Sequence, residues 1–275
     1  MTLNCRGKLI SLKKPKIMGI LNVTPNSFYD GGFYKNKSEV LSQTEKLLNE
    51  GADFIDIGGC SSKPGTEEVS QEEELNRILP AIETILKKLP KTLISVDTFR
   101  SEVAAESLNA GACMINDISA GSYDQNMMKT VAKFQVPYIM MHIKGTPKTM
   151  RQKNHYNDLL KDLIFYFSEK IEAARSAGIN DLIIDPGFGF AKNSTQNFEL
   201  LKKMKLLENL EHPILAGLSR KSTIYKTLKI TAKEALNGTT VMNTLALVNG
   251  ANMLRVHDVK EAAECVALME AYKVA

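Results

Sequence analysis

Polar side chains end or follow each of the short apolar runs in this sequence. The acidic and amide members of this set come from the first six runs and include Asn22, Asp97, Asn116 and Asp185. A carboxylate can accept two parallel N–H bonds, and an amide can both donate and accept. This set therefore suits the donor-rich edge of a flat nitrogenous ring.

The cationic side chains come after the last two apolar runs. Lys221 lies in the turn 217–221 (GLSRK), and Arg255 and His257 end the final run. Cationic side chains and the backbone of glycine-rich turns are groups that bind phosphate or pyrophosphate. The residues alone thus predict a nitrogenous ring and a phosphate held at one site.

Eight apolar runs must position these side chains. They are continuous rather than alternating, as expected of parallel strands covered on both faces, and they span residues 17–21, 54–57, 93–96, 114–115, 138–141, 182–184, 214–216 and 253–254. Amphipathic stretches lie between most of them, which predicts an α/β fold of the (β/α)8 TIM-barrel type, with its polar strand ends meeting at one mouth. A doubly wound open sheet is the alternative, since periodicity does not reveal closure.

Capping residues predict several helix boundaries. Ser38 is expected to cap a helix that stops at Gly51, and the tetrapeptides 70–73 (SQEE) and 231–234 (TAKE) have the form of a capping box. Longer helices are expected over residues 157–177 and 260–272. The first dozen residues predict a short N-terminal hairpin at the barrel floor.

The composition is that of an ordinary globular chain, with 275 residues, 44% of them hydrophobic and 24% charged. It fits a single domain over residues 1–275. The net charge of +4 is scattered without a basic, aromatic-rich run, so we expect no nucleic-acid partner. No apolar run approaches the roughly 20 residues of a membrane span, no signal peptide is evident, and the four cysteines lack metal-ligand spacing. We therefore expect a cytoplasmic protein without a membrane partner.

Eight segments, in order along nearly the whole chain, make the sequence similar to the dihydropteroate synthases, a family of pterin-binding TIM barrels. These segments are 19–32 (GILNVTPNSFYDGG), 56–65 (DIGGCSSKPG), 95–98 (SVDT), 116–118 (NDI), 141–147 (MHIKGTP), 185–190 (DPGFGF), 217–222 (GLSRKS) and 255–258 (RVHD). Each is a weak signal alone, but eight in order are specific.

The resemblance implies a transferase of folate biosynthesis. It would condense 6-hydroxymethyl-7,8-dihydropterin pyrophosphate with p-aminobenzoate to give 7,8-dihydropteroate and pyrophosphate. The resemblance also implies a Mg²⁺ ion on the pyrophosphate, a homodimer and membership of a family that sulfonamides target. Ionisation of the C–O bond would leave a pterin-methyl cation, which the neutral aromatic amine would attack without a strong general base.

Carried over residue by residue, the resemblance assigns a role to each matching side chain. The pterin would contact Asp97, Asn116, Asp185 and Lys221. The pyrophosphate would contact Asn22, Ser62, Arg255 and His257, with Asn22 also at the metal. The p-aminobenzoate would contact Phe28, Ser62, Pro64, Lys221 and Ser222. The catalytic residues would be Asp97, Lys221 and Arg255.

The chain departs from the common family pattern at five positions. Ser62 stands where Thr is usual and keeps its hydroxyl. Asn26 stands where Asp is usual, Cys60 where Glu is usual, Lys63 where Arg is usual and Ala191 where Gly is frequent. Lys63 keeps the positive charge but lacks the planar guanidinium with which Arg donates two parallel hydrogen bonds. These departures affect loop contacts rather than the pterin pocket.

Other polar residues near the strand ends have a structural interpretation. Asp56 is expected only to support the mouth, and His142 is expected to be a buried, hydrogen-bonded histidine. His155 and His212 are expected to be exposed to solvent.

Two other functions remain open from the sequence alone. A methyltransferase that passes a methyl group from methyltetrahydrofolate to a corrinoid protein would share the ring-binding Asp and Asn residues. It would have less use for the Lys221 turn and for Arg255 with His257. A non-catalytic pterin-binding barrel would have no reason to keep Asp97, Lys221 and Arg255 together.

Overall fold

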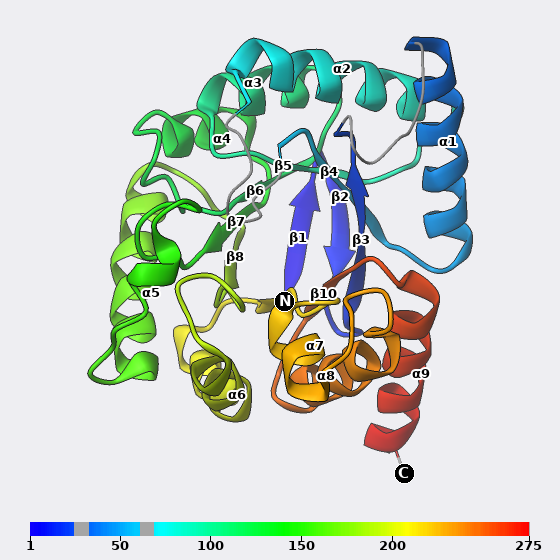
Figure 1. Ribbon diagram of the computed structural model, residues 1–275. Coiled ribbons are helices and arrows are strands. Elements are labelled where there is room, and N and C mark those ends of the chain that lie inside the picture. Colours follow the sequence, from blue (N-terminus) through cyan, green and yellow to red (C-terminus); the bar gives the residue numbers. More distant parts are fainter. Residues whose placement is uncertain (25–32, 61–68, 275) are drawn as a thin grey trace.

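The computed structural model describes residues 1–24, 33–60 and 69–274 of the chain. From β3 (Lys16–Asn22) onward, strands alternate with helices and form one parallel sheet (Figure 1). Its strands follow the order β8-β7-β6-β5-β4-β3-β10-β9. The remaining strands are β4 (Phe54–Gly58), β5 (Ile94–Asp97), β6 (Met114–Asp117), β7 (Tyr138–Met141), β8 (Leu182–Asp185), β9 (Leu215–Ala216) and β10 (Met253–Val256).

The two ends of this strand order meet, so the sheet closes on itself. Ile184 of β8 forms a parallel bridge with Ile214, which directly precedes β9. The backbone N–H of Ile184 donates to the carbonyl of Pro213 at 2.9 Å. The chain is therefore a TIM barrel, as predicted, and the doubly wound open sheet is excluded.

Helices surround the barrel on its outer side (Figure 1). Side chains such as Ile57, Val96 and Ile115 pack outward in the same buried cluster as Ile78 and Val103 of the helices. This two-sided burial is the physical reason for the continuous apolar runs. The helices are α1 (Phe33–Asn49), α2 (Gln71–Lys88), α3 (Ser101–Asn109), α4 (Met127–Phe134), α5 (Leu159–Ser176), α6 (Ser194–Lys203), α7 (Ser222–Leu228), α8 (Leu236–Val248) and α9 (Val259–Val274), with 3₁₀ segments η1 (Met150–Gln152) and η2 (Met204–Leu210).

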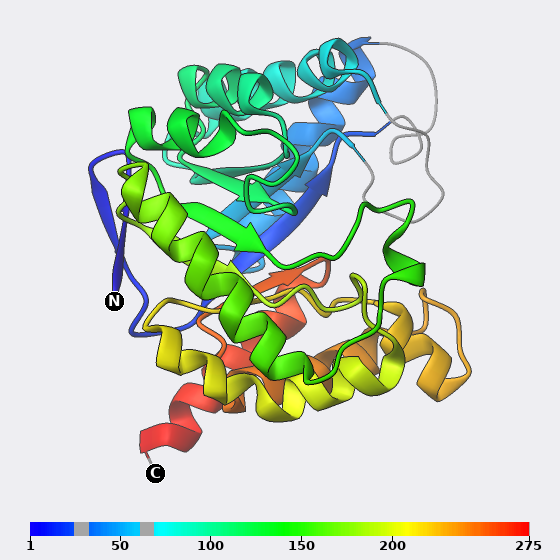
Figure 2. The same ribbon diagram turned by 90° about the vertical axis from the view of Figure 1, so that its left-hand side faces the viewer.

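An antiparallel hairpin of β1 (Thr2–Cys5) and β2 (Lys8–Ser11) closes the barrel floor, which confirms the prediction. Leu3 and Ile10 are register partners in the hairpin, and both are buried. They belong to one cluster with Met18, Phe54 and other residues near the starts of the barrel strands. Figure 2 shows the hairpin (blue) at the end of the barrel from which the strand arrows point away. The opposite end is the mouth.

The helix boundaries follow the capping predictions only in part. Ser70 does cap α2, because its side chain accepts the Glu73 N–H at 3.1 Å. The prediction for Ser38 is wrong, since α1 begins at Phe33 and contains this residue. In the second predicted capping box, the Glu234 carboxylate accepts from Thr231, but this contact closes a turn and α8 begins only at Leu236.

Within the described ranges, none of the helices combines the length and the apolar character that a membrane crossing requires.

Candidate active site

The strand register brings residues of four neighbouring strands, three of them polar, to one level at the mouth. Asn22 of β3 pairs with Gly58 of β4, Gly58 pairs with Asp97 of β5, and Asp97 pairs with Asn116 of β6. A methyl group on Gly58 would lie 3.4 Å from Asn22 Oδ1 and 3.7 Å from Asp97 Cβ. The missing side chain of Gly58 therefore leaves the space that Asn22 and Asp97 share.

The carboxylate of Asp56 connects Arg255 and Asn116 through hydrogen bonds. Its Oδ2 accepts from Arg255 Nε at 2.6 Å and from Asn116 Nδ2 at 3.0 Å. Arg255 also donates through Nη2 to Asp97 Oδ2 at 2.7 Å. Asp56 is fully buried, and its Oδ1 has no hydrogen-bond partner in the described part of the chain. Asp56 thus supports the mouth, as expected, and holds two predicted ligand residues in place.

The charges of this cluster are tightly linked. Burial raises the pKa of Asp97 to about 7, an effect that Arg255 opposes and that the neighbouring Asp56 carboxylate increases. Burial alone would lower the pKa of Arg255, but Asp56 and Asp97 outweigh it and raise that pKa above its ordinary value. Arg255 is therefore a permanent cation at the mouth, whereas Asp97 can change its charge near neutral pH.

Asp185 ends β8 and starts the glycine-rich loop 185–191. Its Oδ1 accepts the Gly187 N–H at 2.8 Å, and its side chain is almost wholly buried. Burial raises the pKa of Asp185, while Lys221, the Gly187 N–H, Arg255 and Lys192 act in the opposite direction. The carboxylate therefore lies among cations and backbone donors that favour its ionised form.

Lys221 follows β9 and reaches across to the same loop. Its Nζ donates to the carbonyl of Phe188 and lies 4.8 Å from the centre of the Phe190 ring. Burial lowers the pKa of Lys221 to about 8, against the opposing Asp185 carboxylate. The sequence did not predict a role for the Phe190 ring, although Phe190 lies in the family segment 185–190. Nothing in that segment indicates that Lys221 packs on the ring.

The turn after β9 is fixed to the end of β10. Ser219 Oγ lies 3.0 Å from His257 Nδ1 and accepts the His257 backbone N–H at 3.2 Å. Arg220 forms two hydrogen bonds to the Asp258 carboxylate, at 2.9 and 2.8 Å. Ser222 begins α7 directly after this turn. The 217–222 turn and the 255–258 segment are thus held as one unit.

The structure brings together most of the residues predicted for the site. Those that converge at the mouth are Asn22, Asp97, Asn116, Asp185, Lys221 and Arg255, with His257 and Ser222 beside them on the last two loops. Phe28, Ser62 and Pro64, together with the departures Asn26 and Lys63, lie outside the described residues.

The histidine predictions are correct for two residues out of three. His142 is buried, with Nδ1 3.0 Å from Lys192 Nζ, and His155 is exposed. The prediction for His212 is wrong, because this side chain is buried and its Nδ1 lies 2.5 Å from the Leu210 carbonyl. Burial, with Lys192 and Lys144 nearby, lowers the pKa of His142 to about 2, so this ring stays neutral and is no acid or base for the reaction.

A metal ion at this mouth would need oxygen atoms from the bound pyrophosphate in addition to protein ligands. Among the described residues, no group of three His, Cys, Asp or Glu side chains could hold a metal by itself. Asn22 offers one neutral amide oxygen next to the space above Gly58. Mg²⁺ commonly keeps several waters and binds one or two protein groups plus substrate phosphates, so the residues present fit an ion that arrives with pyrophosphate.

Comparison with known proteins agrees with this geometry. Residues 18–257 match the family described as pterin binding enzyme. The dihydropteroate synthase of Escherichia coli (strain K12) is 40% identical over 273 residues, which cover 98% of this chain and 96% of the relative.

Two solved structures extend the similarity to three dimensions. The Yersinia pestis dihydropteroate synthase in complex with a sulfonamide drug has a TM-score of 0.94 and 40% identity, with 100% of both chains covered. The Xanthomonas albilineans enzyme in complex with 7,8-dihydropteroate has a TM-score of 0.90 and 37% identity, again with 100% of both chains covered.

These relatives give no support to a corrinoid methyltransferase. The sequence segments, the closed barrel and the cluster of Asp97, Asp185 and Arg255 at its mouth all agree with the same enzyme class. The chain therefore belongs to the dihydropteroate synthase family of pterin-binding enzymes, the transferases that condense 6-hydroxymethyl-7,8-dihydropterin pyrophosphate with p-aminobenzoate.

Proposed function

We propose that the inner part of the mouth binds the pterin ring of the first substrate. Asp185 accepts the N–H groups of the aminopyrimidine edge, Asn116 and Asp97 contact the ring, and Lys221 contacts its carbonyl side. The observation that carries this assignment is the position of Asp185, which is buried among cations and held at Oδ1 by the Gly187 N–H. A buried carboxylate in such surroundings is prepared for a pair of charge-assisted hydrogen bonds.

The pyrophosphate lies further out in this proposal, against Arg255, His257, Asn22 and the undescribed Ser62. Arg255 uses Nε and Nη2 to bind Asp56 and Asp97, which fixes the plane of its guanidinium. A fixed guanidinium binds phosphate oxygens with less loss of side-chain entropy than a mobile one. Asn22 would hold Mg²⁺ together with the pyrophosphate oxygens, and the ion, when bound, would neutralise charge on the leaving group.

The p-aminobenzoate binds on the outer side of the pterin, against Lys221 and Ser222. Phe28, Ser62 and Pro64 belong to the same proposed pocket. The Phe190 ring, which lies under the Lys221 ammonium, adds an apolar wall for an aromatic amine. The sulfonamide complex of the Yersinia pestis relative supports a pocket of this kind, since sulfonamides share the aniline ring of p-aminobenzoate.

The reaction then depends on charge stabilisation and positioning. The C–O bond to pyrophosphate breaks first, and Arg255 stabilises the departing oxygens. The Asp97 carboxylate, 2.7 Å from Arg255, stabilises the pterin-methyl cation that remains. The neutral amine attacks the cation, forms the C–N bond and loses its proton to solvent. Exclusion of water matters because water would otherwise capture the cation.

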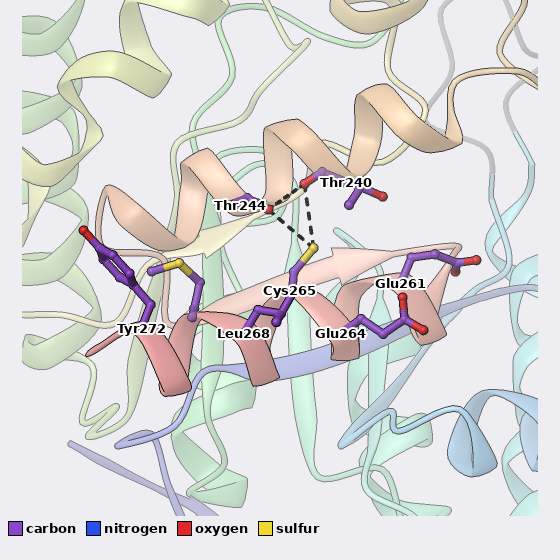
Figure 3. A pocket seen from close by; sticks show the side chains of 8 residues that line it. Thr240, Thr244, Glu261, Glu264, Cys265, Leu268 and Tyr272 are labelled. Carbon is purple, nitrogen blue, oxygen red and sulfur yellow. Dashed lines mark hydrogen bonds between the residues drawn. The ribbon is translucent and has the colours of Figure 1, made fainter. Parts of the chain in front are cut away.

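A second copy of the chain is the proposed partner. Apolar side chains are exposed along one side of α8, at Val241, Leu245 and Val248, and α9 exposes Leu268 and Tyr272, which are 72% and 76% exposed. Between these helices lies a groove of 340 Å³ whose lining includes Thr244, Cys265 and Leu268 (Figure 3). Exposed apolar side chains on two packed helices favour an association site, and the family resemblance favours a homodimer.

Release of pyrophosphate that depends on p-aminobenzoate tests the proposed function. The protein is incubated with dihydropterin pyrophosphate and Mg²⁺, with and without p-aminobenzoate, and both pyrophosphate and dihydropteroate are measured. We expect equal amounts of the two products only when the amine is present in excess. A protein that binds the pterin but forms no dihydropteroate would contradict the proposal.

A further inference from the structure

A buried lysine, Lys192, lies behind the Asp185 loop and has no part in the proposed reaction. Only 8% of its surface is exposed. Its Nζ lies 3.0 Å from His142 Nδ1 and donates to the carbonyls of Gly187 and Phe190, both at 3.1 Å. An ammonium has three donors, so these three acceptors satisfy it completely. Burying a cation is costly, which raises the question of what this lysine does.

The contacts of Lys192 hold the loop that carries Asp185. The Gly187 carbonyl accepts from Lys192, and the Gly187 N–H donates to Asp185 Oδ1 at 2.8 Å. Gly187 has a φ of +71°, and a Cβ at this position would lie 2.1 Å from the His142 carbonyl oxygen. The loop is therefore packed tightly against the end of β7, and Lys192 fixes both ends of its turn.

The contacts of Lys192 also reach the part of the proposed pocket that binds p-aminobenzoate. The Phe190 carbonyl that accepts from Lys192 belongs to the residue whose ring lies under Lys221. Asn197 of α6 also holds the loop, since its Oδ1 accepts the Gly189 N–H at 2.7 Å and its Nδ2 donates to the Lys192 backbone carbonyl at 3.2 Å, without adding charge. The loop is thus held by charged side chains, Lys192 and Lys221, and by neutral ones that include Asn197.

Lys192 also contributes charge to Asp185. The cations that favour the ionised Asp185 come from three elements: Lys221 after β9, Arg255 on β10 and Lys192 after β8. Burial lowers the pKa of Lys192 to about 7, Asp185 opposes this shift, and Lys221 and Lys144 add to it. His142, whose Nδ1 lies 3.0 Å from Lys192 Nζ, stays neutral beside it.

We propose that Lys192 is a positioning residue for the pterin: its buried ammonium braces the 185–191 loop from behind and supplies positive charge that keeps Asp185 ionised. This inference rests on the proposed binding of the pterin by Asp185. It concerns a residue that acts through Asp185 and does not touch the substrate.

The test measures the affinity for 6-hydroxymethylpterin as a function of pH by calorimetry. This probe lacks pyrophosphate, so neither the metal nor a titrating phosphate contributes. In Lys192→Met the side chain stays unbranched and is one atom shorter, and it loses its charge. Loss of the Lys192 cation raises the pKa of Asp185. The affinity for the pterin should therefore begin to fall at a higher pH than in the parent chain. We expect binding at pH 6 to weaken about tenfold, as for a lost charge-assisted contact.

Three matched variants separate charge from loop geometry. Lys192→Arg keeps a cation and should restore the pH profile at least in part. Asn197→Ala loosens the same loop without a change of charge, so it should weaken binding at every pH and leave the midpoint unchanged. Lys203→Met removes a surface lysine of α6 that pairs with Glu199, and it should change neither quantity.

Thermal unfolding at pH 6 measures the structural contribution of Lys192. Lys192→Met leaves the Gly187 and Phe190 carbonyls without this buried donor, so its melting temperature should fall whatever the role of the charge. The pH midpoint is therefore the readout that separates the two roles. A lower melting temperature with an unchanged pH midpoint would overturn the proposal and leave Lys192 as a structural residue.

Asp185→Asn distinguishes failure of this inference from failure of the proposed function. If Asp185→Asn binds the pterin as tightly as the parent chain, the placement of the pterin is wrong. If Asp185→Asn loses binding but Lys192→Met keeps the parent midpoint, only the role of Lys192 is wrong.

Discussion

Asp97 and Lys221 both ionise close to neutral pH, and the proposed chemistry needs both of them charged. The raised pKa of Asp97, about 7, means that its carboxylate is lost as the pH falls through this value. The lowered pKa of Lys221, about 8, means that its ammonium is lost as the pH rises through that value. The kcat/KM for dihydropterin pyrophosphate should therefore be greatest between about pH 7 and 8 and fall about tenfold per pH unit on each side.

The Lys221→Arg variant provides the control for this profile. A guanidinium stays protonated far above pH 8, so the alkaline fall should disappear even if the maximal rate is lower. An alkaline fall that remains unchanged in this variant would show that a different group controls it.

Residue types at the strand ends could be predicted from the sequence, but their connections could not. Asp97, Asn116 and Asp185 follow apolar runs, and parallel strands place such residues at one mouth. A supporting role for Asp56 could be expected, but its bond to Arg255 could not, because the two residues are 199 positions apart in the chain. Lys192 was missed because only the folded loop encloses its ammonium.

At the scale of elements, the apolar runs located the barrel strands to within about two residues at each end. Helix starts were less certain, as Ser38 and the 231–234 segment illustrate. A capping pattern describes a local hydrogen bond, and tertiary packing decides whether a helix continues beyond it. Ser70 met both conditions, because the buried face of α2 begins directly after it.

The N-terminal hairpin offers a test of stability at this scale. Leu3 is 1% exposed in the floor cluster, whereas Leu9 on the neighbouring strand is 71% exposed. Leu3→Ala leaves a cavity among the starts of the barrel strands and should lower the free energy of unfolding by about 2–5 kcal/mol. Urea unfolding followed by circular dichroism measures this quantity.

Leu9→Ala is the matched control in the same hairpin. An exposed position of this kind should change the free energy of unfolding by no more than about 0.5 kcal/mol. Equal effects of the two substitutions would mean that the hairpin does not close the barrel floor.

At the scale of the whole molecule, closure of the sheet is what makes one site from residues spread over the full sequence. The bridge between Ile184 and Ile214 joins the two ends of the strand order. Closure could be inferred from the number of apolar runs and from the family resemblance, not from periodicity. The contacts of Phe28, Ser62 and Pro64 stay predictions, since these residues lie outside the described ranges.

The proposed homodimer can be tested through the exposed face of α8 and α9. Leu268→Lys places a charge on this face and should convert a dimer into a monomer in sedimentation analysis. The matched control is Leu206→Lys, a change at an apolar residue of η2 that is also exposed, at 50%, and it should leave the mass unchanged. A Leu268→Lys protein with the same mass as the parent dimer would exclude this face as the interface.

The central claim is that the mouth stabilises a pterin-methyl cation before the amine attacks. It can be tested with dihydropterin pyrophosphate that carries a heavy oxygen isotope in the bridge between the methylene carbon and phosphorus. Reversible ionisation at the mouth lets the bound pyrophosphate turn and return, so we predict that the label moves to non-bridging positions when p-aminobenzoate is absent. A label that stays in the bridge, while the same protein forms dihydropteroate once the amine is added, would contradict the account.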